Sequence, residues 1–279
     1  MATKKAVASV KHSTVAAKTS NTKASSVKAV SSNRKTWLSG SPLSRAPFVG
    51  ALVAEFVGTF LLASTIITGQ GQPIIILFAF AGIALLVGAL SGAHLNPAIS
   101  IAAWATRRVT GLRALGYIGA QFLGAGLAFA VLNAFVGGAA PVDAQAQAFG
   151  QQAAASLFHA TALPAGKEWY IFFAELLGTT ILGFALANAL RERKDRVASA
   201  LTGGLGIFVA LLVAASAAAY VGGSAILNPA AALSLQALKW ELWPLAVYVL
   251  APVIGGIVGF ILNDVLQAEN DGGRDRLVG

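Results

Sequence analysis

The sequence predicts an all-α membrane protein with six transmembrane helices and two half-helices arranged as an inverted repeat. The first supporting observation is composition, since the 279 residues are 56% hydrophobic and only 11% charged, with a mean hydropathy of +0.72. Soluble domains carry roughly 25% charged residues, so the chain belongs to the membrane class. The second observation is a series of long apolar segments, and the third is that the two halves of the chain repeat one another.

The chain begins with a polar, basic segment, residues 1–46, which contains nine lysines and arginines and no acidic residue. It has no long apolar run and so does not match a secretory signal. We expect a disordered cytoplasmic tail, because such a segment has too little apolar surface to fold. Two alternatives stay open. The tail would contact anionic lipid, at roughly 1 kcal/mol per lysine near the surface, or it would be an organellar transit peptide, which its preference for Lys over Arg disfavours.

Six apolar segments follow, and each is long enough to cross a bilayer, for which about 20 residues suffice. Two further apolar segments are too short to cross, and each begins at an Asn-Pro. The expected spans are approximately 47–68, 73–91, 114–136, 169–190, 198–221 and 242–266, and the short segments are 97–106 and 229–238.

The placement of cations predicts the orientation. If the N-terminus is cytoplasmic, the inner side collects every lysine and arginine except Lys167 and Lys239. This asymmetry follows the positive-inside rule, so we expect both termini in the cytoplasm and the chain in the cell (plasma or inner) membrane. The expected division is a first repeat at 47–136, an extracellular connection at 137–168, a second repeat at 169–266 and a cytoplasmic C-terminal tail at 267–279.

Three pairs of motifs recur in the same order in the two halves. They are "AEFVGTF" (54–60) with "AELLGTT" (174–180), "HLNPAIS" (94–100) with "ILNPAAA" (226–232), and "YIGAQFLGAG" (117–126) with "YVLAPVIGGI" (248–257). Matches in one order indicate two copies of one unit. Each copy has three spans, an odd number, so the second copy enters the membrane inverted, and we expect the functional site near the midplane where the broken helices meet.

The two Asn-Pro-Ala motifs are read as helix starts. Proline suits the first helical position and asparagine is among the best N-cap residues. Within hydrocarbon such a start is tolerated only when it is buried or lines a water-filled cavity. Inversion points the two N-termini at each other, and each carries about +0.5 of an elementary charge. Cations and protons are therefore repelled, whereas a neutral solute accepts hydrogen bonds from the amides of Asn96 and Asn228.

Together, the paired motifs, the paired "AExxGT" segments, "SGAHLNPA" and the "YxxAQ" and "YxxAP" segments resemble the aquaporin, or major intrinsic protein, family. The resemblance covers about residues 47–266. It implies a pore in each subunit, a homotetramer, and passive conduction of water or small uncharged solutes such as glycerol and ammonia, without a cofactor. The pore motifs are then Asn96, Pro97, Ala98, Asn228, Pro229 and Ala230.

The chain departs from the family at the outer filter. An arginine normally follows the second motif, where it narrows the pore and repels cations, but Ala231 stands here. All ten arginines lie on the expected cytoplasmic side, so none replaces it. The aspartate that often comes next in glycerol facilitators is also absent, since Ala232 is there. By resemblance the outer filter consists of Ile76, Ser216, Ala225 and Ala231, which predicts a wider and less polar mouth than in a strict water channel.

Two glutamates lie within spans, where a carboxylate is costly and suggests function. The resemblance implies that Glu55 and Glu175 hydrogen-bond the backbone of the loops that enter the half-helices, and that His94 has a structural role beside the cytoplasmic vestibule. An alternative makes both glutamates proton carriers of a coupled secondary transporter. A further alternative is a non-conducting membrane structural protein.

Catalytic and metal sites receive no support from the sequence. The chain has no cysteine, its three histidines are far apart, and it has neither a metal-ligand spacing nor a nucleophile–base pattern. We therefore expect no enzyme activity and no cofactor. The expected partners are membrane lipid, further copies of the chain and a small neutral solute, with no nucleic acid.

Overall fold

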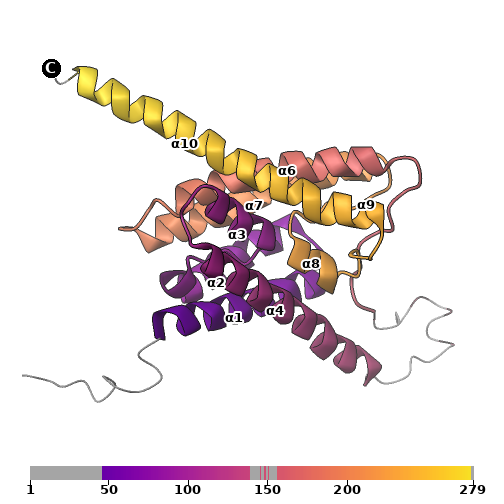
Figure 1. The fold of residues 1–279 in the computed structure, drawn as a ribbon. Coiled ribbons are helices and arrows are strands. Elements are labelled where there is room, and N and C mark those ends of the chain that lie inside the picture. The colour runs from indigo at the N-terminus through magenta and orange to yellow at the C-terminus, as the bar shows by residue number, and fades with distance from the viewer. Residues whose placement is uncertain (1–45, 139–144, 146–147, 149, 151–155, 278–279) are drawn as a thin grey trace, which may run out of the picture. The chain divides into compact units, whose positions relative to one another are not determined.

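The computed structural model describes residues 46–138, 145, 148, 150 and 156–277. The described residues form helices and loops, without a strand (Figure 1). The expected tail through residue 45 and most of residues 139–155 in the expected connection lie outside the described residues.

Six helical segments are long and apolar enough to cross a membrane, which confirms the predicted fold class. They are α1 (Ala46–Thr68), α2 (Pro73–Ser91), α4 (Gly111–Gly137), α6 (Glu168–Ala189), α7 (Arg196–Ala219) and a sixth made of α9 (Leu242–Leu245), the π-helical turn η2 (Ala246–Leu250) and α10 (Ala251–Leu277). Two short helices, α3 (Pro97–Ala105) and α8 (Pro229–Ser234), begin at the Asn-Pro-Ala motifs.

Capping side chains explain where the helices depart from the predicted bounds. Helix α4 begins three residues early because the Thr110 side chain accepts from the backbone N–H of Arg113. Helix α7 begins at Arg196 because the Asp195 carboxylate accepts from two backbone N–H groups at 2.9 Å. Helix α8 stops before the expected residue 238, since Gln236 adopts a left-handed φ of 58°. Helix α10 continues past residue 266 to Leu277.

The two halves pack in the same way. In the first half α1 lies between α2 and α4, and in the second half α6 lies between α7 and α10, while α2 and α7 join the halves. Two equivalent glycines permit close crossings. A Cβ on Gly124 would come within 3.0 Å of the Phe60 nitrogen in α1, and a Cβ on Gly255 within 3.0 Å of the Thr180 nitrogen in α6. Small residues of this kind let membrane helices approach closely.

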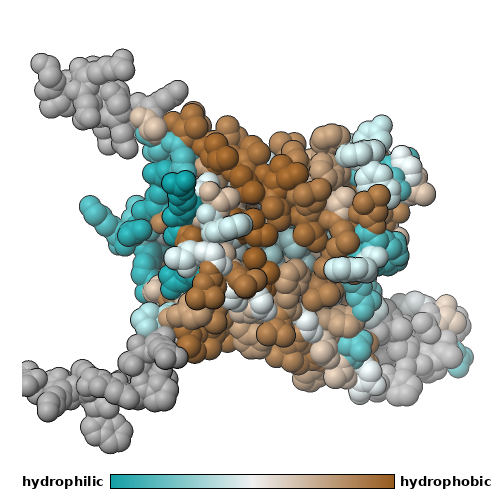
Figure 2. All heavy atoms as spheres, in the orientation of Figure 1, coloured by the Kyte–Doolittle hydropathy of each residue, from teal (hydrophilic) through white to brown (hydrophobic). Residues whose placement is uncertain are grey.

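The surface has the distribution expected of a multi-pass membrane protein. A broad hydrophobic band separates two hydrophilic ends in Figure 2. One end carries the arginines that follow α3 and α6, and the other carries an aromatic group in which Trp169 packs against Phe172 and Trp243 at ring centroid distances of 5.4 and 5.1 Å. Aromatic residues are enriched where a bilayer meets water.

Candidate functional site

The two Asn-Pro-Ala motifs start the half-helices. The Asn96 side-chain oxygen accepts from the backbone N–H of Ala98 at 2.9 Å. The Asn228 oxygen accepts from the backbone N–H groups of Ala230 at 3.0 Å and Ala231 at 3.3 Å. Proline fills the first helical position in both. Both asparagines are therefore N-caps, as the motif predicts.

The same asparagines join the two halves of the chain. The Asn96 amide nitrogen donates to the backbone oxygen of Leu227 at 2.8 Å, and the Asn228 amide nitrogen donates to that of Leu95 at 2.9 Å. All four residues are at most 5% exposed. An amide nitrogen carries two hydrogens, so each asparagine keeps a second donor beyond this crossed pair.

The two leucines need an unusual backbone to present these oxygens. Leu95 and Leu227 have φ values of 52° and 62°, in the left-handed region that branched side chains rarely adopt. Their side chains lie over two glycines, since a Cβ on Gly58 or Gly178 would come within 2.5 or 2.6 Å of a leucine methyl carbon. The conformation is thus fixed by the crossed hydrogen bonds and by close packing on α1 and α6.

Both buried glutamates hold the loops that precede the half-helices. The Glu55 carboxylate accepts from the backbone N–H groups of His94 at 2.9 Å and Leu95 at 2.7 Å. The Glu175 carboxylate accepts from those of Ile226 at 2.5 Å and Leu227 at 2.8 Å. Each carboxylate uses both oxygens on backbone donors, which is the arrangement that the resemblance implies.

A further polar network exists in the first half. The Gln121 amide nitrogen donates to Glu55 at 2.7 Å and to the Ser100 hydroxyl at 2.9 Å, and that hydroxyl lies 3.2 Å from Nδ1 of His94. The second half has Pro252 and Ala232 at the positions equivalent to Gln121 and Ser100, so the repeat is not symmetric here. The network fixes the His94 ring, which also packs edge-on against Tyr117.

A cavity of about 690 Å³, named the inner cavity after the orientation expected from the sequence, lies at the end of the molecule that carries the arginines. Its charged and titratable lining residues are His94, Arg107, Arg108, Arg191, Arg193 and Asp264. Four cations and one carboxylate give this mouth a positive potential.

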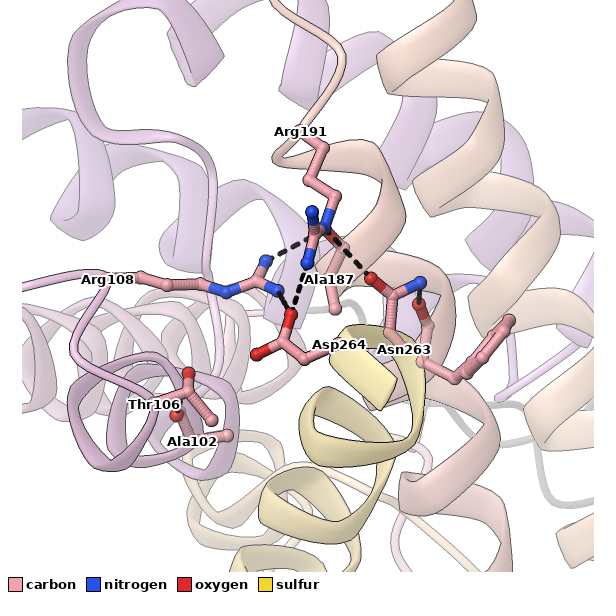
Figure 3. Close-up of polar contacts among 8 residues, drawn as sticks. Ala102, Thr106, Arg108, Ala187, Arg191, Asn263 and Asp264 are labelled. Carbon is pink, nitrogen blue, oxygen red and sulfur yellow. Dashed lines mark hydrogen bonds and ion pairs between the residues drawn. The ribbon is translucent and has the colours of Figure 1, made fainter. Parts of the chain in front are cut away.

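Two of these arginines converge on one carboxylate, as Figure 3 shows. Arg108 donates to Asp264 at 2.5 Å and to the backbone oxygen of Ala187 at 2.8 Å, while Arg191 pairs with Asp264 and donates to Asn263 at 3.1 Å. The cluster joins the loop after α3 to the C-terminal end of α6 and to the middle of α10. It therefore anchors the first half-helix to the second half of the chain.

An outer cavity of about 160 Å³ lies on the other side of the motifs and reaches Asn228. Apart from Ser224 and Asn228, side chains without hydrogen-bonding groups line it. These include Ile66, Ile76, Phe158, Ile207, Leu211, Ala215 and Ala225. The arrangement gives a narrow compartment in which a solute finds few hydrogen-bond partners.

The four expected filter residues have different positions. Ile76 and Ala225 line the outer cavity. Ala231, in the first turn of α8, is 1% exposed and packs in the hydrophobic core. Ser216 does not line the cavity, whereas its neighbour Ala215 does. Arginines are found among the described residues at the inner mouth, while none lines the outer cavity.

Several lining residues were not foreseen from the sequence. Ile207 and Leu211 are spaced four apart on α7, the spacing that places two residues on one helix face. That pattern is common to every apolar helix, so it does not distinguish a pore face from a core face. Phe158 lies in the connection between the repeats, where no motif pointed to it. Among the described residues no group of three or more His, Asp or Glu could hold a metal ion.

Comparison with known proteins finds a matching family profile and related sequences. A family profile described as "Major intrinsic protein" matches residues 42–262. The chain is 32% identical over 230 residues to "Glycerol uptake facilitator protein-like 6" of Lactiplantibacillus plantarum, covering 78% of this chain and 98% of the relative. It is 29% identical over 237 residues to "Aquaporin NIP1-1" of Zea mays, covering 80% of this chain and 77% of the relative.

Solved structures show the same fold. The chain superposes on the X-ray structure of the aquaglyceroporin from Plasmodium falciparum with a TM-score of 0.58, at 21% sequence identity. The superposition covers 78% of this chain and 96% of that one.

Proposed function

The chain belongs to the major intrinsic protein family, whose members are channels rather than enzymes, and is a passive channel for water and small uncharged solutes. We propose that this channel admits solutes as large as glycerol and excludes ions at its two Asn-Pro-Ala motifs. Relatives named as a glycerol facilitator and as aquaporins support both water and glycerol as cargo.

The observation that carries the proposal for glycerol is the apolar outer cavity. Isoleucine, leucine, phenylalanine and alanine side chains line it, without an arginine among its described lining residues. Apolar walls suit the carbon backbone of a small polyol, and the Ser224 hydroxyl and the Asn228 amide offer it hydrogen bonds. An arginine after the second motif would narrow this compartment and add a positive charge.

Ion exclusion is proposed to reside at the crossed asparagines. The N-termini of α3 and α8 meet there, and the second N–H of each amide is directed to a passing solute. We assign the pore motifs to Asn96, Pro97, Ala98, Asn228, Pro229 and Ala230. Glu55 and Glu175 support the loops, because both oxygens of each carboxylate accept hydrogen bonds from backbone N–H groups of those loops.

The assembly and topology are proposed on family and charge grounds. We infer a homotetramer in the cell membrane with cytoplasmic termini, made of two inverted repeats at 47–136 and 169–266. Eighteen cations on the inner side support this orientation. The basic tail, residues 1–46, is proposed to contact anionic lipid.

Substitution of Ala231 by arginine tests the account of the outer filter. In proteoliposomes we expect the Ala231→Arg variant to lose glycerol permeability on the order of tenfold or more, while water permeability falls less, because glycerol is the larger solute. Stopped-flow light scattering after osmotic shocks measures water, glycerol and ammonia permeability in the wild type and the variant.

The matched control is Ala231→Met, which adds an unbranched, flexible chain without a charge, although a shorter one than that of arginine. Equal loss of glycerol flux in both variants assigns the effect to size, and a greater loss with arginine assigns it to charge and hydrogen bonding. Unchanged glycerol permeability in Ala231→Arg contradicts the proposed filter. Uptake that saturates and is abolished by a protonophore contradicts the passive channel.

A further inference from the structure

One residue that lines the outer cavity does not belong to a transmembrane helix. Phe158 lies in the described part of the connection between α4 and α6, half-buried, with its ring in the lining of the cavity. The family-derived filter of four positions did not include this segment. Contacts of Phe158 and of the residues that follow it hold the ring in this position.

The backbone beside Phe158 is tied to both ends of the loop that carries the second motif. The Ala160 N–H donates to the backbone oxygen of Leu235, just after α8, at 3.1 Å. The Thr161 N–H donates to the Ser224 hydroxyl, before α8, at 3.0 Å, and that hydroxyl donates to the Thr161 hydroxyl at 3.1 Å. Three hydrogen bonds thus hold the connection across the outer face of the second half-helix.

The ring itself packs against the turn between α1 and α2. Gly71, in that turn, has a φ of 66°, and a Cβ placed on it would come within 2.7 Å of the Phe158 ring. Only a glycine allows this contact. The connection is thus bound to the second repeat through its backbone, and the Phe158 ring reaches the α1–α2 turn of the first repeat, where it forms part of the cavity wall.

The ring stands in a compartment that already lacks charge. It adds bulk without a hydrogen bond, and the lining offers a solute only the side-chain polar groups of Ser224 and Asn228. A bulky aromatic group at a narrow, apolar mouth limits the size of a solute. It also disfavours solutes that must keep a full hydration shell.

We propose that Phe158 is a specificity-determining residue of this pore, which sets the upper size of the uncharged solutes that enter from the outer side. This inference rests on the channel function proposed above. It assigns to the connection between the repeats the steric role that Ala231 cannot fill.

A series of linear polyols of increasing length tests the proposal. Wild-type protein, Phe158→Ala and Phe158→Trp are reconstituted in liposomes of one lipid composition, and permeability to water, glycerol, erythritol and xylitol is measured by stopped-flow light scattering. We expect Phe158→Ala to raise erythritol permeability relative to glycerol on the order of tenfold, as a size change in an apolar pocket does. We expect Phe158→Trp to lower glycerol permeability more than water permeability.

The control is Leu157→Ala, since Leu157 is the neighbouring residue and packs on the core without lining the cavity. Its polyol series should match the wild type. Phe158→Leu keeps an apolar anchor without the ring and replaces Phe158→Ala if the latter is poorly incorporated, with the same shift toward longer polyols expected.

Two outcomes separate failure of this inference from failure of the channel function. If the wild type conducts glycerol and every Phe158 variant keeps the wild-type permeability ratios among water, glycerol and the longer polyols, the proposed role of Phe158 is wrong and the channel function stands. If wild-type liposomes are no more permeable to water or glycerol than empty ones, the channel function and the inference both fall.

Discussion

At the scale of single residues, the buried carboxylates do the work that lets a helix start inside a membrane. Each loop before a half-helix has backbone N–H groups that form no hydrogen bond within a helix, and hydrocarbon offers them no acceptor. Glu175 meets two of them, at Ile226 and Leu227, and is itself 0% exposed. The carboxylate is therefore placed where acceptors are otherwise missing.

The Glu175→Gln variant should be less stable than the wild type. Glutamine offers one acceptor oxygen and presents an NH₂ group to the second backbone donor, and an unsatisfied buried donor costs about 1–3 kcal/mol. We expect a lower midpoint of thermal unfolding in detergent, measured by circular dichroism, together with lower water permeability.

The matched control is Glu192→Gln in the loop between α6 and α7. Glu192 also accepts from two backbone N–H groups, those of Lys194 and Asp195, and these bonds hold the pKa of its carboxyl below the usual value. It is exposed to solvent, which replaces a lost acceptor. A midpoint shift as large in Glu192→Gln as in Glu175→Gln would contradict the assigned role of burial.

At the scale of the helices, close crossings rather than apolar area alone fix how the elements pack. Gly124 on α4 meets the backbone of α1 at Phe56 and Phe60, and Gly255 on α10 meets that of α6 at Leu176 and Thr180. Side chains at these points would separate the helices. The crossings recur at equivalent positions because the two halves are repeats of one structural unit.

Replacing Gly124 by alanine should destabilise the fold, because the new methyl group would overlap backbone atoms that cannot rotate away. Overpacking of this kind costs typically about 1–3 kcal/mol. Gly119→Ala on the same helix is the control, since a Cβ there has open space around it, and alanine is the better helix former by roughly 1 kcal/mol. Thermal midpoints in detergent should fall for the first and be unchanged or rise for the second. The reverse order would refute the crossing argument.

Helix positions were largely predictable, and the lining of the pore was not. The six apolar spans lie within three residues of their expected bounds, although helix α10 itself continues beyond its span, because the length of an apolar run sets where a helix can cross a bilayer. The Asn-Pro pairs marked both half-helix starts for a local reason, the preference of asparagine for the N-cap. The position of Phe158 depends on hydrogen bonds from its neighbours Ala160 and Thr161 to Leu235 and Ser224. These partners are remote in sequence, and no local pattern encodes such contacts.

The expected filter residues show the same limit, since the sequence did not determine which of them line the pore. Ile76 and Ala225 face the outer cavity, but so does Ala215 in place of its neighbour Ser216. The rotation of α7 about its own axis decides which of these two residues faces the cavity, and packing against α2 and α6 sets that rotation. An apolar helix surrounded by lipid and protein has no polar stripe from which its rotation can be read.

At the scale of the whole molecule, charge is divided between the two ends. Arg107, Arg108, Arg191 and Arg193 gather around the inner cavity, whereas the outer cavity is apolar. A permeating solute thus passes between a cationic mouth and an uncharged one. The division also supports the proposed orientation, because cations are retained on the cytoplasmic side.

The absence of cysteine from the sequence allows a direct test of this orientation. Tyr220, which is 91% exposed at the end of α7, is replaced by cysteine in one variant, and Arg193 in another. In intact cells that produce the chain, a membrane-impermeant maleimide should label Tyr220→Cys and not Arg193→Cys. Both should be labelled after permeabilisation. The opposite pattern in intact cells would reverse the proposed topology, and the unsubstituted chain serves as the blank.

The crossed hydrogen bonds of the asparagines also bear on how the chain is made. The Leu95 carbonyl oxygen accepts from the Asn228 side chain, and Asn228 is synthesised 133 residues after Leu95. Until then the first re-entrant loop lies in the bilayer with its acceptor unmet, a state that costs free energy in hydrocarbon. Neither loop therefore has all of its hydrogen bonds until both repeats have been synthesised. Biogenesis must hold the first repeat in an unfinished form until translation delivers the second.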